Sequence, residues 1–232
     1  ELLVLFLLFF DTFNLSYSII ATKIGFMITQ GVFTTVYVSA ISIAIAFVLA
    51  LLGATARLSS NGFAIAIASF YTSFFRGVPL LIQIYLIYLG IPQLGYVVGA
   101  VPAGILALSL CYGAYMTEIF RAGISSISRG QWEASRAIGL NPFQTMTRVI
   151  LPQSMRLIIP PTGNQFISML KDSSLVSVIG VWELMFLART QGRAEFRHLE
   201  MLITAAVLYW LLSIVLETVQ ARLEKHFNRA HR

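Results

Sequence analysis

The amino-acid sequence predicts an all-α protein that crosses a lipid bilayer about five times. Hydrophobic residues make up 57% of the 232 residues and charged residues only 11%, whereas a soluble domain carries about 25% charged residues. The mean hydropathy is +0.80. Several apolar stretches reach the ~20 residues that a helix needs to cross the hydrocarbon core. Most of the surface is therefore expected to face lipid, and the chain is interpreted as a polytopic membrane protein without a separate soluble domain.

About five core transmembrane helices are expected along the chain. They are residues 31–56, 63–90, 101–119, 157–181 and 201–219. The second is interrupted by an Arg-Gly-Val-Pro sequence at residues 76–79, and the fourth is unusually polar. Residues 31–232 are predicted to form one transmembrane domain, preceded by an apolar segment, residues 1–30, whose role is open. Its first part, residues 2–10, is too short to cross alone and is interpreted as the end of a longer helix or as an interfacial segment.

The distribution of Lys and Arg predicts the orientation of these spans. The most basic connections are residues 121–156 and the segment after residue 219. Both are expected in the cytoplasm, which makes the chain a multi-pass protein of the cell inner (plasma) membrane with a cytoplasmic C-terminus. The net charge of +6 is thereby explained without a nucleic-acid partner. Residues 182–200 then lie outside, against the rule, since this connection holds three arginines: Arg189, Arg193 and Arg197.

Sequence motifs of enzymes are missing from the chain. It contains neither a G-x-x-x-x-G-K-[ST] phosphate loop nor an H-E-x-x-H zinc motif. The three histidines lie in a loop or in the tail, where no helix face gathers them as metal ligands. They are His198, His226 and His231. We therefore expect no catalysis, no metal site and no cofactor in this chain.

The basic connection contains a local pattern typical of two short helices. Residues 131–138 form an amphipathic helical pattern that ends at Gly139, and Asn141-Pro142 favours the start of a second helix, since proline suits a first turn. Pro152 is expected to stop or kink that second helix. Two short helices at a membrane face, with alanines and an exposed glutamate, form either a docking element for another protein or an ordinary interfacial elbow.

This connection resembles the EAA motif of the permeases of ATP-binding-cassette (ABC) importers. The motif is a Glu-Ala-Ala sequence, a glycine four residues later and a distal Ile-x-Leu-Pro; here Ser135 replaces the second alanine and Val149 the isoleucine. In that family the loop, here about residues 121–156, is the coupling helix that sits in a groove of the ATPase subunit. The resemblance implies that the coupling residues are Glu133, Ala134, Ser135, Gly139 and Leu140.

Three further blocks are similar to the polar amino acid permeases, the histidine/glutamine/glutamate/arginine group. They are residues 74–83, 115–124 and 164–175, in the order of that family. The resemblance implies a type I ABC importer permease fold and half of a translocation pathway for polar amino acids. It also implies three kinds of partner: a second permease, identical or homologous; two ABC ATPases, which bind the ATP and Mg; and an extracytoplasmic amino-acid-binding protein. The side chain of the transported amino acid and the choice between homodimer and heterodimer remain open.

Charged and polar residues within the expected spans indicate a substrate site. An arginine at mid-depth costs at least ~2.5–3.5 kcal/mol unless it is paired or faces water. Arg76 is therefore read either as a counter-ion for Asp172 or as the ligand of a substrate carboxylate, and Pro79 is expected to open the helix beside it. Glu118 is read as a loop anchor that pairs with Arg121.

The fourth span carries a broad polar face that lipid would not tolerate. It must face the partner subunit or a wet pathway. Asp172 is expected to bind the α-amino group, while Arg76 or Lys171 binds the carboxylate; alternatively, Lys171 and Asp172 form a structural pair. The predicted substrate-binding residues are Arg76, Asn164, Gln165, Ser168, Lys171 and Asp172.

Two other functions were considered for the same residues. An ion-coupled secondary amino acid transporter explains the charges at mid-depth, but it gives no reason for the docking element at residues 131–140. A non-transporting membrane scaffold needs neither Arg76 nor Asp172 within a span.

Overall fold

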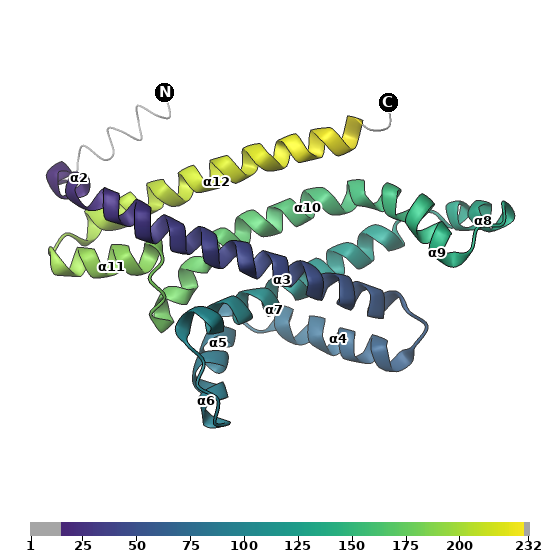
Figure 1. Ribbon diagram of the computed structural model, residues 1–232, viewed down its shortest axis with the longest axis horizontal. Helices are drawn as coiled ribbons and strands as arrows, with labels where there is room; N and C mark the ends of the chain where they lie inside the picture. The colour runs from purple at the N-terminus through teal and green to yellow at the C-terminus, as the bar shows by residue number, and fades with distance from the viewer. Residues whose placement is uncertain (1–14, 230–232) are drawn as a thin grey trace.

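The computed structural model describes residues 15–229, and every regular element in this part is a helix (Figure 1). The expected segment at residues 2–10 lies outside the described residues. The elements are α2 (Tyr17–Phe26), the π-helix η1 (Met27–Val32), α3 (Phe33–Leu58), α4 (Gly62–Gly77), α5 (Leu80–Tyr85), the π-helix η2 (Leu86–Gly90), α6 (Ile91–Gln93), α7 (Ala100–Ser125), α8 (Arg129–Ala137), α9 (Pro142–Thr145), the π-helix η3 (Met146–Ile150), α10 (Leu151–Asp172), the 3₁₀-helix η4 (Ser173–Ile179), α11 (Leu184–Ala194) and α12 (His198–Arg229).

The described helices provide three membrane spans, or five if each bent pair of helices crosses once. Three stretches of the described chain are long and apolar enough to cross alone: Tyr17–Leu58, Ala100–Ser125 and His198–Lys225. Two bent pairs complete the count, with bends of 107° between Gly62–Gly77 and Leu80–Gln93 and of 50° between Pro142–Ile179 and Leu184–Ala194. The predicted number of spans is therefore reached only if each bent pair crosses once.

The core of the bundle is the contact between α3 and α7, where small residues allow a close approach. A Cβ atom added to Gly53 would lie 2.5 Å from Oγ1 of Thr117, and Ala46 and Ala50 of α3 are fully buried. The Ser109 hydroxyl donates a hydrogen bond of 3.3 Å to the Ser42 carbonyl. Small residues and interhelical hydrogen bonds are the usual means by which helices associate in lipid.

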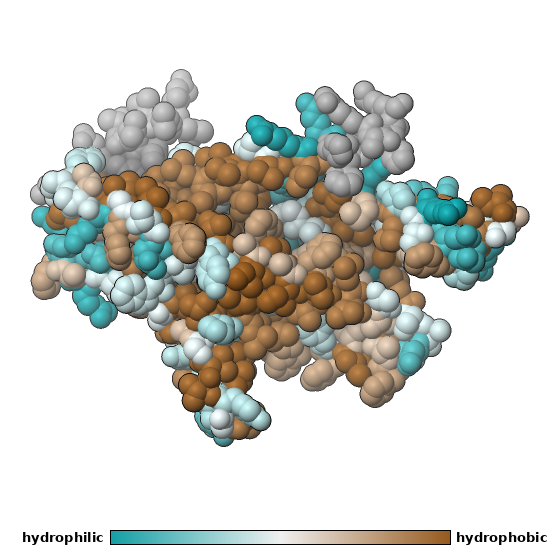
Figure 2. Space-filling view, in the orientation of Figure 1, coloured by the Kyte–Doolittle hydropathy of each residue, from teal (hydrophilic) through white to brown (hydrophobic). Residues whose placement is uncertain are grey.

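The outer surface is apolar across the middle of the molecule. Figure 2 shows this brown surface, with hydrophilic residues gathered mainly towards the two ends. Large side chains such as Leu52, Phe70 and Trp210 are more than half exposed. In water this exposure would be unfavourable, whereas in a bilayer it provides the lipid-facing belt.

The structure corrects several predicted boundaries. The opening expected at Pro79 is confirmed, because Val78 is extended (φ −94°, ψ 134°) before Pro79, as residues that precede proline prefer. It divides residues 63–90 into α4 and the stretch formed by α5 and η2. Arg76 accordingly lies at the end of α4 and not in the middle of a helix. Pro152 does not stop the chain's helix, which runs from the π-turn η3 into α10.

Residues 182–200 were expected to be a loop, but they contain α11. Glu183 begins this helix, since its carboxylate accepts hydrogen bonds from the amides of Met185 and Phe186. The last span is also longer than expected, because α12 continues to Arg229. Figure 1 shows α8 and α9 at one end of the molecule and α2 and α11 at the other.

Candidate functional site

A cavity of about 540 Å³ opens where α4 gives way to α5. We call it the break cavity. It is lined by Arg76, Gly77, Val78, Pro79 and Leu80 of the break, by Cys111, Tyr112 and Tyr115 of α7, and by Gln165 and Asp172 of α10. Three of the six predicted substrate-binding residues, Arg76, Gln165 and Asp172, therefore meet in one cavity.

Arg76 is exposed to this cavity at the C-terminal end of α4. Its guanidinium carbon lies 5.5 Å from the ring centroid of Tyr115, a distance at which the ring attracts the cation. The last carbonyls of a helix also favour a positive charge. These two contacts hold the guanidinium without neutralising it.

Asp172 faces the same cavity from α10. The Tyr112 hydroxyl donates a hydrogen bond of 2.7 Å to Oδ2 of Asp172. In the part of the chain that the structure describes, Asp172 forms an ion pair with neither Arg76 nor Lys171. Neither of the two structural ion pairs considered for Asp172 is therefore present among the described residues. The cavity presents one cation, Arg76, and one anion, Asp172.

Gln83 stabilises the break and was missed by sequence reasoning. Its side chain is 2% exposed, and Nε2 donates to the carbonyls of Phe75 (2.9 Å) and Val78 (2.8 Å). These carbonyls lose their helical partners at the break, and an unpaired buried carbonyl is costly in a membrane. A lone glutamine in an apolar run just after a proline is the signal that could have indicated this role.

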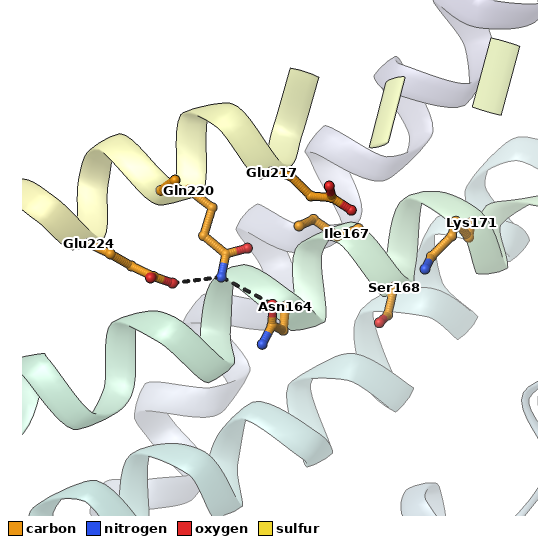
Figure 3. A pocket seen from close by; sticks show the side chains of 8 residues that line it. Asn164, Ile167, Ser168, Lys171, Glu217, Gln220 and Glu224 are labelled. Atoms are coloured by element: carbon orange, nitrogen blue, oxygen red, sulfur yellow. Dashed lines mark hydrogen bonds between the residues drawn. The ribbon is translucent and has the colours of Figure 1, made fainter. Parts of the chain in front are cut away.

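The other predicted residues lie in a separate place. Asn164, Ser168 and Lys171 line an open groove of about 370 Å³ between α10 and α12 (Figure 3). We call it the polar groove. Its α12 wall consists of Glu217, Gln220, Ala221 and Glu224. Asn164, Ser168 and Lys171 thus share one face of α10 as predicted, but Asp172, which was predicted on the same broad face, lines the break cavity instead.

The α12 side chains of the polar groove were also missed by sequence reasoning. The expected fifth span ended at residue 219, so Gln220 and Glu224 counted as tail. The signal was the spacing of Glu217, Gln220 and Glu224, which places all three on one face of a helix.

The expected docking element is α8, which projects at one end of the molecule (Figure 1). Glu133 and Ala134 are exposed, whereas Ser135 is 2% exposed and its hydroxyl donates to the Gln131 carbonyl at 2.7 Å. Gly139 has φ +83°, a left-handed conformation that favours glycine. The Leu140 amide then bonds to the Ser135 carbonyl at 3.1 Å and closes the helix.

The two-helix pattern of this connection is confirmed. Asn141 and Gln144 form a reciprocal capping box at the start of α9, with Pro142 in the first turn. The expected pair of Glu118 and Arg121 is present at 2.9 Å, and Arg57 of α3 joins it at 3.4 Å.

Comparison with known proteins explains why the break cavity and the docking element α8 occur in one chain. Residues 46–229 match the family described as "Binding-protein-dependent transport system inner membrane component". The chain belongs to this family. Membership makes it a multi-pass permease of the inner membrane, a transport subunit and not an enzyme, with an ATPase and a binding protein as partners.

Similar proteins include permeases from Bacillus subtilis. The chain is 38% identical to the L-cystine transport system permease protein TcyB, over 88% of this chain and 87% of that protein. It is 36% identical to the arginine transport system permease protein ArtQ, over 91% and 97%. The probable amino-acid ABC transporter permease protein YckA is 38% identical over 86% and 88%.

Solved structures agree with this relationship. The permease covers all of a chain from the crystal structure of an amino acid ABC transporter with histidines, at 32% identity, 92% coverage of this chain and a TM-score of 0.86. The MetNI methionine ABC transporter, at 21% identity and a TM-score of 0.75, supports the fold. The predicted type I ABC importer permease fold is therefore confirmed, and the ABC importer interpretation is supported over the ion-coupled transporter.

Proposed function

We propose that this permease forms half of the translocation pathway for amino acids, and that the break cavity binds the α-amino and α-carboxylate groups of the substrate. One observation carries the proposal. Arg76 and Asp172 line the same cavity at the break within the bent pair of α4 and α5, and in the described chain neither forms an ion pair. Broken helices commonly build the substrate sites of transporters.

The chemistry of the cavity matches the part that all amino acids share. The planar guanidinium of Arg76 suits a carboxylate, which it can bind through two parallel hydrogen bonds. Asp172, oriented by Tyr112, suits the ammonium group, and Gln165 supplies further polar contacts. Cystine and arginine, for which the relatives TcyB and ArtQ are named, differ in their side chains but share this zwitterionic head group.

The remaining parts of the transporter are assigned to the two ends of the molecule. α8, with Glu133, Ala134, Ser135, Gly139 and Leu140, docks into the ATPase on the cytoplasmic side, where the C-terminus also lies. The ATP and Mg belong to that ATPase and not to this chain. A second permease, identical or homologous, supplies the other half of the pathway, and an amino-acid-binding protein delivers substrate at the α11 end.

The substrate role is tested with the double variant Arg76→Met, Asp172→Leu in proteoliposomes that contain the complete transporter. A pair with only a structural role can be replaced by apolar side chains without loss. We expect instead that the variant assembles with its ATPase but takes up no amino acid. Normal uptake by this variant would show that the break cavity is not the substrate-binding site.

The coupling role is tested with Glu133→Lys. We expect this variant to lose the ATPase during purification, or to hydrolyse ATP without uptake, while its spans stay folded. The matched control is Gln93→Lys, which also places a lysine at an exposed position, but in α6, away from α8 (Figure 1). If Glu133→Lys assembles and transports like the unmodified protein, α8 is not the coupling element.

A further inference from the structure

The polar groove lies beside the break cavity but opens on another face of α10. Successive residues separate the two: Asn164 and Lys171 line the groove, and Gln165 and Asp172 line the break cavity. Its volume of about 370 Å³ falls within the range of about 300–1,000 Å³ that is usual for small-molecule sites. The groove is therefore large enough to hold a ligand of its own.

Three charged side chains line the polar groove. Lys171 comes from α10, and Glu217 and Glu224 come from α12. Among the described residues none of the three forms an ion pair within 4.0 Å. Charges on membrane helices are costly unless they meet a partner or water, so this groove faces water or a polar partner and not lipid.

The charges follow one another along the groove. Figure 3 shows Lys171 and Ser168 towards one end, Glu224 at the other, and Glu217 on the facing wall between them. Glu217 and Glu224 are seven residues apart, which corresponds to about 10 Å along a helix. The order is thus a cation, then an anion, then a second anion at some distance.

Gln220 fixes the anionic end of the groove. The two N–H groups of its Nε2 are shared among three acceptors: Oε1 of Glu224 at 2.8 Å, Oδ1 of Asn164 at 3.1 Å and the Pro160 carbonyl at 3.2 Å. A Cβ atom added to Gly163 would lie 2.6 Å from Cδ of Gln220, so α12 approaches α10 closely here. Oε1 of Gln220 is buried and accepts no hydrogen bond from the described residues, so Gln220 acts on the groove through its Nε2 donor alone.

We propose that the polar groove is a second amino-acid site in this chain and that it selects substrates with a cationic side chain. Lys171 binds the α-carboxylate, Glu217 the α-ammonium group and Glu224 the side-chain cation. Two carboxylates against one ammonium leave the empty groove with a charge of −1, which a lysine-like or arginine-like ligand of charge +1 balances. The inference rests on the proposed function, since it takes the substrate to be an amino acid.

The test compares L-arginine with L-citrulline, which has nearly the same shape but no side-chain charge. Binding of each radiolabelled ligand is measured on the permease assembled with its ATPase in lipid nanodiscs. We expect arginine to bind about tenfold more tightly, because a charge-assisted hydrogen bond is lost with citrulline. Glu224→Gln should remove this preference without changing citrulline affinity, and Lys171→Met should weaken both ligands.

The matched control is Glu195→Gln, the same chemical change at a carboxylate that pairs with Lys23 outside the groove; it should keep the preference. The proposal is overturned if Glu224→Gln weakens both ligands equally or leaves arginine binding unchanged. It is also overturned if Glu217→Gln separates the two permeases in native mass spectrometry, because the groove would then be a subunit contact. A transporter that takes up amino acids without favouring arginine contradicts this inference alone, whereas one that takes up none contradicts the proposed function.

Discussion

The break cavity and the polar groove flank the same helix, α10, but they are built in different ways. The break cavity depends on the backbone, because Pro79 ends α4 and Gln83 pairs the carbonyls that the break exposes. The polar groove depends on side chains, because α10 and α12 run past each other unbroken. One cavity presents a single cation and a single anion, and the other presents one cation and two anions. On the roles proposed above, the break cavity recognises the head group alone, whereas the polar groove recognises the head group together with a cationic side chain.

The largest effect is expected from Arg76→Lys. A lysine keeps the charge but cannot reproduce the bidentate geometry of the guanidinium. Loss of that charge-assisted contact corresponds to about 1.5–3 kcal/mol, or roughly 10- to 100-fold in apparent affinity. Uptake assays with arginine and citrulline should show equal losses, since both share the α-carboxylate.

Unequal losses for Arg76→Lys would mean that this residue contacts the substrate side chain, and the break cavity would then recognise more than the head group. Arg222→Lys, on the described part of α12 but outside the lining of either cavity, is the matched control. It should leave the uptake of both amino acids unchanged.

The next largest effect is expected from Gln83, which stabilises the helix break at the break cavity. Gln83→Leu removes the side-chain donor of the Val78 carbonyl and leaves the Phe75 carbonyl with only the weak Cys111 thiol donor, and an unpaired buried group costs about 1–3 kcal/mol. We expect a lower thermal midpoint in detergent and weaker uptake of both amino acids. Gln93→Leu, at an exposed position in α6, should change neither measurement. A stable and fully active Gln83→Leu protein would show that the break persists without its glutamine.

The two sites differ in how far sequence alone could predict them. The helix break and the pair of short helices α8 and α9 could be predicted from local signals. Pro79, Gly139 and Asn141-Pro142 each determine the backbone conformation of the residues next to them. Which face of α10 meets which helix is decided by packing across the bundle, so periodicity alone could not divide its five predicted substrate-binding residues between two cavities. α11 was missed since it is short and mixed in polarity, and its cap, Glu183, is not among the residues preferred at that position.

A moderate effect is expected from Gly163→Ala. The added methyl group would overlap Gln220 and displace the hydrogen bonds that orient Glu224. Arginine binding should fall several-fold, about 1 kcal/mol, with citrulline binding unchanged. Gly25→Ala, where a Cβ atom meets no heavy atom within 4 Å, provides the control. Equal losses for both ligands would mean that the groove and the break cavity are coupled through α10.

The smallest effect is expected from Tyr112→Phe, which removes the hydroxyl that donates to Asp172 at 2.7 Å. Asp172 is exposed, so water can replace the lost donor and the cost falls to about 0.5–1 kcal/mol. This corresponds to a two- to fivefold rise in the apparent KM for uptake. The rise should be the same for arginine and citrulline, because Asp172 is assigned to the ammonium group that both carry. Tyr96→Phe, at an exposed loop position, should leave both KM values unchanged. A rise confined to arginine would instead place its side chain in the break cavity, and the two cavities would exchange the roles assigned to them.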